Sequence, residues 1–138
     1  MAGKHNLFWF SAAVVTGVTL YSMKRRKEKP TLIVKDSLPF GFNAFTLPPI
    51  GVYVTRDQAE NEALLKHELV HWKQFQEMGL LRYYLCYASQ YVANGYDGMQ
   101  MEKQARAECG ETDYCQDNYT DCVRGGNAKT VFNPSFKK

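Results

Sequence analysis

The chain has 138 residues, which is one domain by length, and its 45% hydrophobic and 22% charged residues exclude a disordered or collagen-like chain. The formal net charge of +3 is unevenly distributed. Residues 1–29 carry a net charge of +5, whereas residues 30–138 carry −2. Because the basic excess lies outside the segment that is expected to fold, no nucleic-acid partner is expected.

The first expected element is a helix over residues 7–23, where no charged residue occurs. Such a helix spans about 26 Å, close to the thickness of a bilayer's hydrocarbon core. We therefore expect a transmembrane helix in the N-terminal segment 1–23, with the lipid bilayer as its partner. A cleaved signal peptide would carry its basic cluster before the apolar run, and a buried core helix would show a polar face.

Basic residues are concentrated just after this run, in a predicted juxtamembrane linker at residues 24–30. The positive-inside rule then predicts a single-pass membrane protein with residues 30–138 on the cytoplasmic side.

Two or three short strands are expected next, because β-branched and aromatic residues form short runs separated by Pro and Gly. These runs are Thr31–Lys35, Phe42–Leu47 and Ile50–Val54. Three helices are expected after them, over residues 55–78, 80–92 and 98–115. The first would begin with a capping box at Thr55 and Gln58 and end at Gly79. The sequence thus predicts a small α+β domain over residues 31–115 and an irregular C-terminal tail over residues 116–138.

The first of these helices contains an HExxH pattern, His67-Glu68-Leu69-Val70-His71. Residues four apart lie on one face of a helix, so both imidazoles can reach one Zn²⁺ at about 2.0–2.1 Å. Glu68 points about 100° round the helix, beside the metal, where it can take a proton from a zinc-bound water. The alternative is a pair of core histidines satisfied by hydrogen bonds. The pattern favours zinc, with His67 and His71 as metal ligands and Glu68 as the catalytic base.

Two histidines leave a catalytic zinc one protein ligand short, and the third must be a carboxylate or a thiolate. Glu102 lies 31 residues after His71, where the third helix can return against the first. Ala105, one turn later, allows close helix packing. Glu102 is therefore the predicted third metal ligand, with Glu108 and then Cys109 as the alternatives.

The segments HELVHWKQFQEMG, LLRYYLCYASQYVANGYDG and MEKQARAE resemble the gluzincin metallopeptidases, most of all the compact minigluzincin-like proteins of bacteria and phages. The resemblance covers Leu38 to Glu108. The family often has Asn-Pro shortly before the ligand Glu, whereas this chain has Asp97–Met101 there. The resemblance implies a small zincin-like domain, with short strands followed by three helices and HExxH on the first of them. In this sequence the expected fold class is that domain preceded by the transmembrane helix.

By position, the resemblance makes His67, His71 and Glu102 the zinc ligands and Glu68 the general base. It implies hydrolysis of a peptide by a zinc-bound water that Glu68 activates. The strand before the helix, within residues 42–54, would hold the substrate backbone by strand addition. Five tyrosines after the HExxH helix offer hydroxyl groups for a further hydrogen bond, and the sequence does not choose among them: Tyr83, Tyr84, Tyr87, Tyr91 and Tyr96.

The leading hypothesis for the function is therefore a membrane-anchored zinc metallopeptidase, with a peptide or protein substrate. The alternative is a non-catalytic structural subunit of a virion or membrane complex that retains a zinc site and contacts assembly partners. A hydrolase of cell-wall peptides would need the domain outside the membrane, against the charge rule. An open substrate cleft distinguishes an enzyme from a structural subunit.

The cysteines add no clear site. Cys86 is expected to be a buried thiol in the second helix. Cys109, Cys115 and Cys122 are spaced six and seven residues apart, which matches no familiar zinc pattern. A disulfide among them would suit an oxidising compartment, in conflict with the predicted topology.

Overall fold

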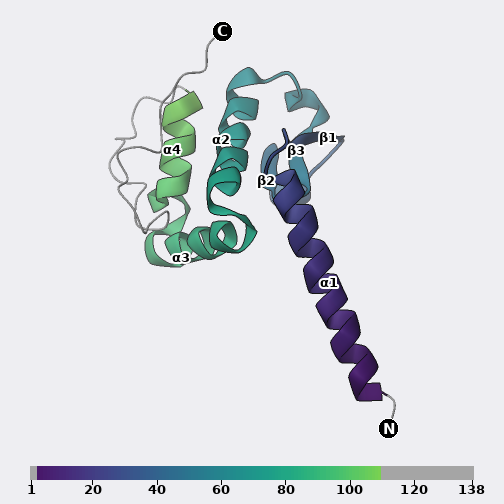
Figure 1. The fold of residues 1–138 in the computed structure, drawn as a ribbon. Coiled ribbons are helices and arrows are strands. Elements are labelled where there is room, and N and C mark those ends of the chain that lie inside the picture. The colour runs from purple at the N-terminus through teal and green to yellow at the C-terminus, as the bar shows by residue number, and fades with distance from the viewer. Residues whose placement is uncertain (1–2, 110–138) are drawn as a thin grey trace.

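A computed structural model describes the backbone of residues 3–109 and the side chains of residues 11–108. This part of the chain is a small α+β fold with four α-helices and one three-stranded sheet (Figure 1). The predicted tail at 116–138, and Cys115 and Cys122, lie outside the described residues. In chain order the elements are α1 (Gly3–Arg25), β1 (Thr31–Lys35), β2 (Ala44–Leu47), β3 (Gly51–Thr55), α2 (Glu62–Met78), α3 (Leu80–Gly98) and α4 (Gln100–Cys109), with 3₁₀ turns at Pro39–Gly41 and Arg56–Gln58.

The predicted transmembrane helix is the main error of the sequence analysis. Residues 7–23 lie within α1, but no helix in the described part of the chain combines the length and the apolarity needed to cross a bilayer. The prediction rested on the absence of charge, which is a weaker property than apolarity. Ser11, Thr16, Gly17 and Thr19 interrupt the apolar residues of this run and lower its hydropathy. The expected transmembrane part of the fold class and the expected single-pass membrane localisation are therefore wrong.

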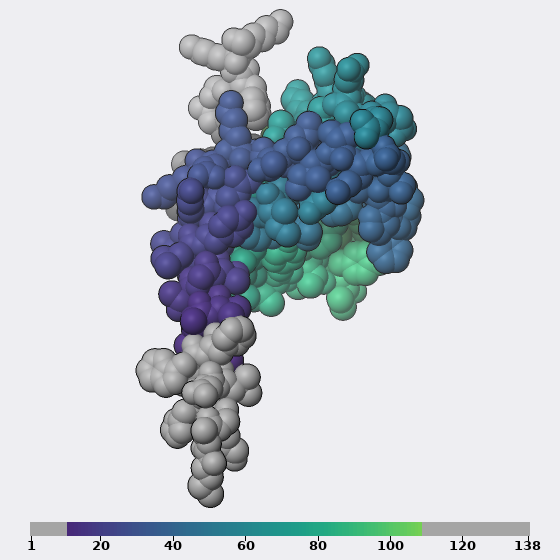
Figure 2. Space-filling view, turned by 90° about the vertical axis from the view of Figure 1, so that its right-hand side faces the viewer, coloured from purple at the N-terminus to yellow at the C-terminus, as the bar shows by residue number. Residues whose placement is uncertain are grey.

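Two basic residues at the C-terminal end of α1, Arg25 and Arg26, contact the folded body. The Arg25 guanidinium donates to the carbonyl oxygens of Pro49 and Ile50, each at 3.1 Å, and lies 5.3 Å from the centre of the Trp72 ring. Trp72 Nε1 in turn donates to the carbonyl oxygen of Glu28 at 2.9 Å. The C-terminal end of α1 is thus attached to the sheet and to α2, while its preceding turns extend away from the body (Figure 1; Figure 2 shows them from residue 11 onward).

The sheet has the strand order β1-β3-β2, so that β3 is central. β1 runs parallel to β3, with Thr31 opposite Gly51, and β2 runs antiparallel to it, with Ala44 opposite Val54. Gly51 is required at this position, because a Cβ there would lie 2.3 Å from the carbonyl oxygen of Thr31. Val52 and Val54 are buried. β2 forms one edge of the sheet, beside α2.

The helix that carries HExxH begins later than predicted. Its N-cap is Asn61, whose side chain accepts a hydrogen bond from the first turn, and residues 56–58 form a separate 3₁₀ turn. Thr55 does not cap the helix because its amide and its hydroxyl both donate to the carbonyl oxygen of Asn43. The predicted end is confirmed: Gly79 terminates α2 with a φ of 79°, in the left-handed region that glycine adopts easily.

α2 lies between the sheet and α4, and α3 crosses beneath α2 and α4 (Figure 1). α3 is longer than predicted and bends at Gly95, where φ is 66°. Cys86 is buried in α3, as expected. The central hydrophobic cluster joins three helices and consists of Trp72, Phe75, Met78, Tyr83, Cys86 and Met101. This packing brings the start of α4 against the middle of α2.

Candidate metal centre

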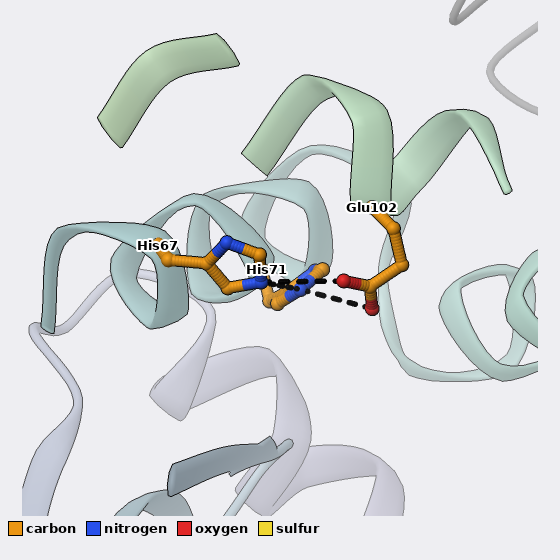
Figure 3. A group of neighbouring side chains, drawn as sticks. All are labelled: His67, His71 and Glu102. Atoms are coloured by element: carbon orange, nitrogen blue, oxygen red, sulfur yellow. Dashed lines mark hydrogen bonds and ion pairs between the residues drawn. The ribbon is translucent and has the colours of Figure 1, made fainter. Parts of the chain in front are cut away.

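Three of the side chains singled out in the sequence converge where α2 meets α4 (Figure 3). The Nε2 atoms of His67 and His71 lie 3.2 Å apart. Oε2 of Glu102 lies 3.2 Å from Nε2 of His67, and Oε1 of Glu102 lies 3.3 Å from Nε2 of His71. Ligand atoms bound at 2.0–2.1 Å to a tetrahedral zinc are about 3.3 Å from one another. Each of the three side chains can therefore offer one ligand atom to a single metal ion, and these ligand atoms all lie within 4.8 Å of one another.

The chemistry of these atoms also fits a cation. Glu102 is 1% exposed, and its Oε2 atom has no hydrogen-bond partner among the described residues. Burial alone would raise the pKa of Glu102, but the contacts with the His67 and His71 rings hold it well below its usual range. Burial likewise opposes the charged form of His71, yet the Glu102 carboxylate raises its pKa. Both shifts show that this buried site favours positive charge beside the carboxylate.

Gln74 determines which ring nitrogen of His71 faces this group. Its side chain is completely buried, and its Oε1 atom lies 2.9 Å from His71 Nδ1. A neutral His71 that donates from Nδ1 presents the lone pair of Nε2 to Glu102 and His67. Two ordinary core histidines would need an added proton between these three acceptor atoms, whereas a bound cation would satisfy all three at once.

Glu68 is buried beside the three ligand candidates and does not belong to their group. Its Oε2 atom accepts a hydrogen bond of 2.7 Å from the hydroxyl of Thr46 in β2. The edge strand of the sheet therefore holds this carboxylate beside the candidate ligands. A carboxylate that lies beside a metal site without being a ligand has the placement of a general base.

The centre opens into a pocket of about 340 Å³. Residues Ala44, Phe45 and Thr46 of β2 form one wall, and Phe42 lies beside them. The opposite wall comes from α3, and all five tyrosines that the sequence left open line the pocket: Tyr83, Tyr84, Tyr87, Tyr91 and Tyr96. A pocket with an aromatic lining and a few convergent polar groups is typical of a ligand or substrate site.

Hydrogen bonds orient several of these tyrosines. Tyr87 donates to Glu102 Oε1 at 3.1 Å, and Tyr84 donates to the carbonyl oxygen of Pro48. Burial raises the pKa of Tyr84 to about 12 and is also the main cause that raises the pKa values of Tyr87 and Tyr96. These phenols therefore stay protonated at neutral pH and act as hydrogen-bond donors. Tyr87 supports the ligand candidate Glu102.

Glu108, the first alternative for the third ligand, does not belong to the group of candidate ligands. Glu108 lies further along α4, beside a different pocket that Lys66 also lines, and accepts a hydrogen bond from Gln104 at 3.3 Å. The side chain of Cys109 lies outside the described residues. Sequence reasoning assigned no role to Thr46 or Gln74, and it left Tyr87 as one of five candidate hydrogen-bond donors. Gln74 could have been found from its position three residues after His71, on the same helix face.

A search of protein-family models, curated proteins and solved structures finds no match for this chain.

Proposed function

We propose that this chain is a zinc-dependent hydrolase of the gluzincin type, which cleaves a peptide bond in a peptide or protein substrate. The observation that carries the proposal is the convergence of His67, His71 and Glu102: the two Nε2 atoms lie 3.2 Å apart, and each lies 3.2–3.3 Å from one of the two Glu102 oxygens. Two imidazoles and one carboxylate are a donor set typical of catalytic zinc, which keeps a further position open for water. Zinc bound here would supply a Lewis acid for the attack on a carbonyl group.

The remaining steps belong to the residues of the chain. Glu68 would accept the proton of the attacking water and pass it to the leaving amine, as a general base and then a general acid. Thr46 holds the carboxylate of Glu68 during this transfer. Tyr87 and Gln74 keep Glu102 and His71 in place.

The pocket supports a peptide as the substrate. β2 is an edge strand, and its residues Ala44–Thr46 line the pocket beside Glu68. The free edge of such a strand can pair with an extended peptide through backbone hydrogen bonds. An extended substrate on β2 would pass directly across the metal centre, where a scissile carbonyl could meet both zinc and Glu68.

The test uses the full chain, with elemental analysis for zinc and mass spectrometry of a peptide library for hydrolysis. We expect one zinc per chain, and its loss in His71→Ala. Glu68→Gln should keep the zinc and lower hydrolysis at least a hundredfold, because a general base contributes roughly 10²- to 10⁴-fold to a rate. Glu62→Gln, an exposed position on the same helix, is the matched control and should leave both unchanged.

Two outcomes would contradict the proposal. If Glu68→Gln lost the zinc, Glu68 would be a ligand and could not be the base. If the wild-type chain bound zinc and cleaved no peptide, the site would be that of a non-catalytic zinc protein.

A further inference from the structure

Gln74 makes more contacts than the orientation of one histidine requires. Its Nε2 atom donates to the carbonyl oxygen of Met101 at 3.0 Å and to Oε1 of Gln104 at 2.9 Å. Since both partners of Nε2 are acceptors, the other end of the amide, Oε1, must be the one that faces His71. The same buried amide thus contacts a ligand candidate on α2 and the backbone of α4.

The contact on α4 is made at the residue directly before Glu102. Met101 is completely buried, and its backbone amide donates to Oε1 of Gln90 in α3 at 3.0 Å. Amide groups in the first turn of a helix have no acceptor within that helix. Gln90 supplies this acceptor, and Gln74 binds the carbonyl group of the same residue. Two glutamines from two other helices therefore hold the start of α4.

The position of Glu102 depends on this attachment. α4 has ten described residues, and so short a helix is marginally stable without tertiary contacts. A metal site tolerates errors of only about 0.2 Å in its ligand distances. A small displacement of α4 would therefore move the Glu102 oxygens out of reach of a metal held by His67 and His71.

We propose that Gln74 is a positioning residue of the metal centre. Its one amide joins His71 Nδ1 to the carbonyl group of Met101. It thereby fixes both the tautomer of His71 and the distance of Glu102 from the two rings. This inference rests on the proposed zinc site. It adds a specific requirement at position 74, namely an acceptor at one end of the side chain and a donor at the other.

The test compares zinc affinities of the full chain, measured by competition with a chromophoric chelator. Gln74→Met keeps the length of the side chain and removes both functions, and we expect zinc to bind about 10- to 100-fold more weakly. Gln76→Met is the matched control, because Gln76 lies on the same helix and donates to the Glu28 carbonyl oxygen at the end of α1. Its affinity should stay within about twofold of wild type.

Gln74→Glu separates the two functions and carries the test if Gln74→Met does not fold. The new carboxylate still accepts from His71, but it faces the oxygens of Met101 and Gln104 and cannot donate to them. We expect an affinity at least tenfold below wild type, together with a changed visible spectrum of the Co²⁺-substituted chain, because Glu102 is displaced.

The outcomes distinguish this inference from the proposed function. If wild type binds zinc through His71, yet the folded Gln74 variants match its affinity and its Co²⁺ spectrum, the role of Gln74 is refuted and the zinc site stands. If wild type binds no zinc, both proposals fail.

Discussion

Thr46 connects the edge of the sheet to the carboxylate that would act as the base. Its hydroxyl oxygen lies 2.7 Å from Glu68 Oε2 and 2.9 Å from the backbone oxygen of Glu68. The hydroxyl has one proton, and a carboxylate is the stronger acceptor, so the proton is donated to Oε2. This hydrogen bond fixes the rotation of the carboxylate beside the metal position.

We predict that Thr46→Val leaves zinc binding unchanged and lowers kcat/KM about 10- to 100-fold. A hydrogen bond to a charged group is worth about 1.5–3 kcal/mol, and its loss lets Glu68 leave the position for proton transfer. Zinc content and hydrolysis of the best peptide from the library are the measurements. Thr46→Ser restores the hydroxyl and should recover most of the rate. Equal rates for wild type and Thr46→Val would show that Thr46 has no such role.

The sequence predicts some residues of the site and not others. His67 and His71 share a helix face for local reasons, so their spacing alone predicts that their side chains meet. Glu102 needed an assumption about how the third helix returns. Thr46 and Gln74 were not predicted, because their roles depend on which strand and which helix pack against α2. Nothing in the residues next to Thr46 indicates that β2 lies beside Glu68.

At the scale of elements, the end of α1 joins two parts of the fold. Arg26 donates to the carbonyl oxygens of Gln76 and Glu77, in the last turn of α2. These carbonyl groups have no partner within their own helix, and an arginine beside them also complements the helix dipole. Arg25 binds the turn between β2 and β3, through Pro49 and Ile50. The two arginines thus link the sheet to α2.

Arg25→Met should therefore destabilise the fold, by about 2–3 kcal/mol in the free energy of unfolding. The Arg25 side chain is only 12% exposed, so its backbone acceptors would lose a charged partner in a largely buried place. Urea unfolding followed by circular dichroism is the measurement. Lys24→Met removes the same charge from the adjacent exposed position and should change stability by less than about 0.5 kcal/mol. Equal midpoints for the two variants would contradict a linking role for Arg25.

The elements also show where sequence patterns stop being informative. β1 is found at its predicted residues, because its run of β-branched residues and its flanking breakers are local. The start of α2 was predicted wrongly, because the Thr55 hydroxyl donates to the carbonyl oxygen of Asn43 and does not cap the helix. Only the folded sheet brings Asn43 beside Thr55. The basic cluster at the end of α1 was interpreted through its charge alone. Its acceptors in α2 and in the turn between β2 and β3 lie 24 to 51 residues away in sequence, beyond any local pattern.

For the whole molecule, the candidate metal centre is also a junction of the fold. It lies where α2 and α4 pack together, and both the sheet and α3 contribute to the pocket around it. The described part of the chain is small, and domains of this size have few buried side chains to stabilise them. A bound cation would contact the His67, His71 and Glu102 side chains together and so join α2 to α4 at its centre. Zinc should therefore stabilise the fold in addition to its proposed role in hydrolysis.

We predict that zinc raises the melting temperature of the full chain by roughly 10–20 °C when it is present at a hundred times its dissociation constant. That excess stabilises a folded protein by about 2.7 kcal/mol, and each kcal/mol shifts Tm by about 4–8 °C in a domain of this size. The measurement is a thermal scan of the chelator-treated chain with and without added zinc. His71→Ala should show no zinc-dependent shift, whereas Glu68→Gln should keep it, because Glu68 is not a ligand. An equal shift in wild type and His71→Ala would mean that zinc binds elsewhere, and α2 and α4 would then meet without a metal between them.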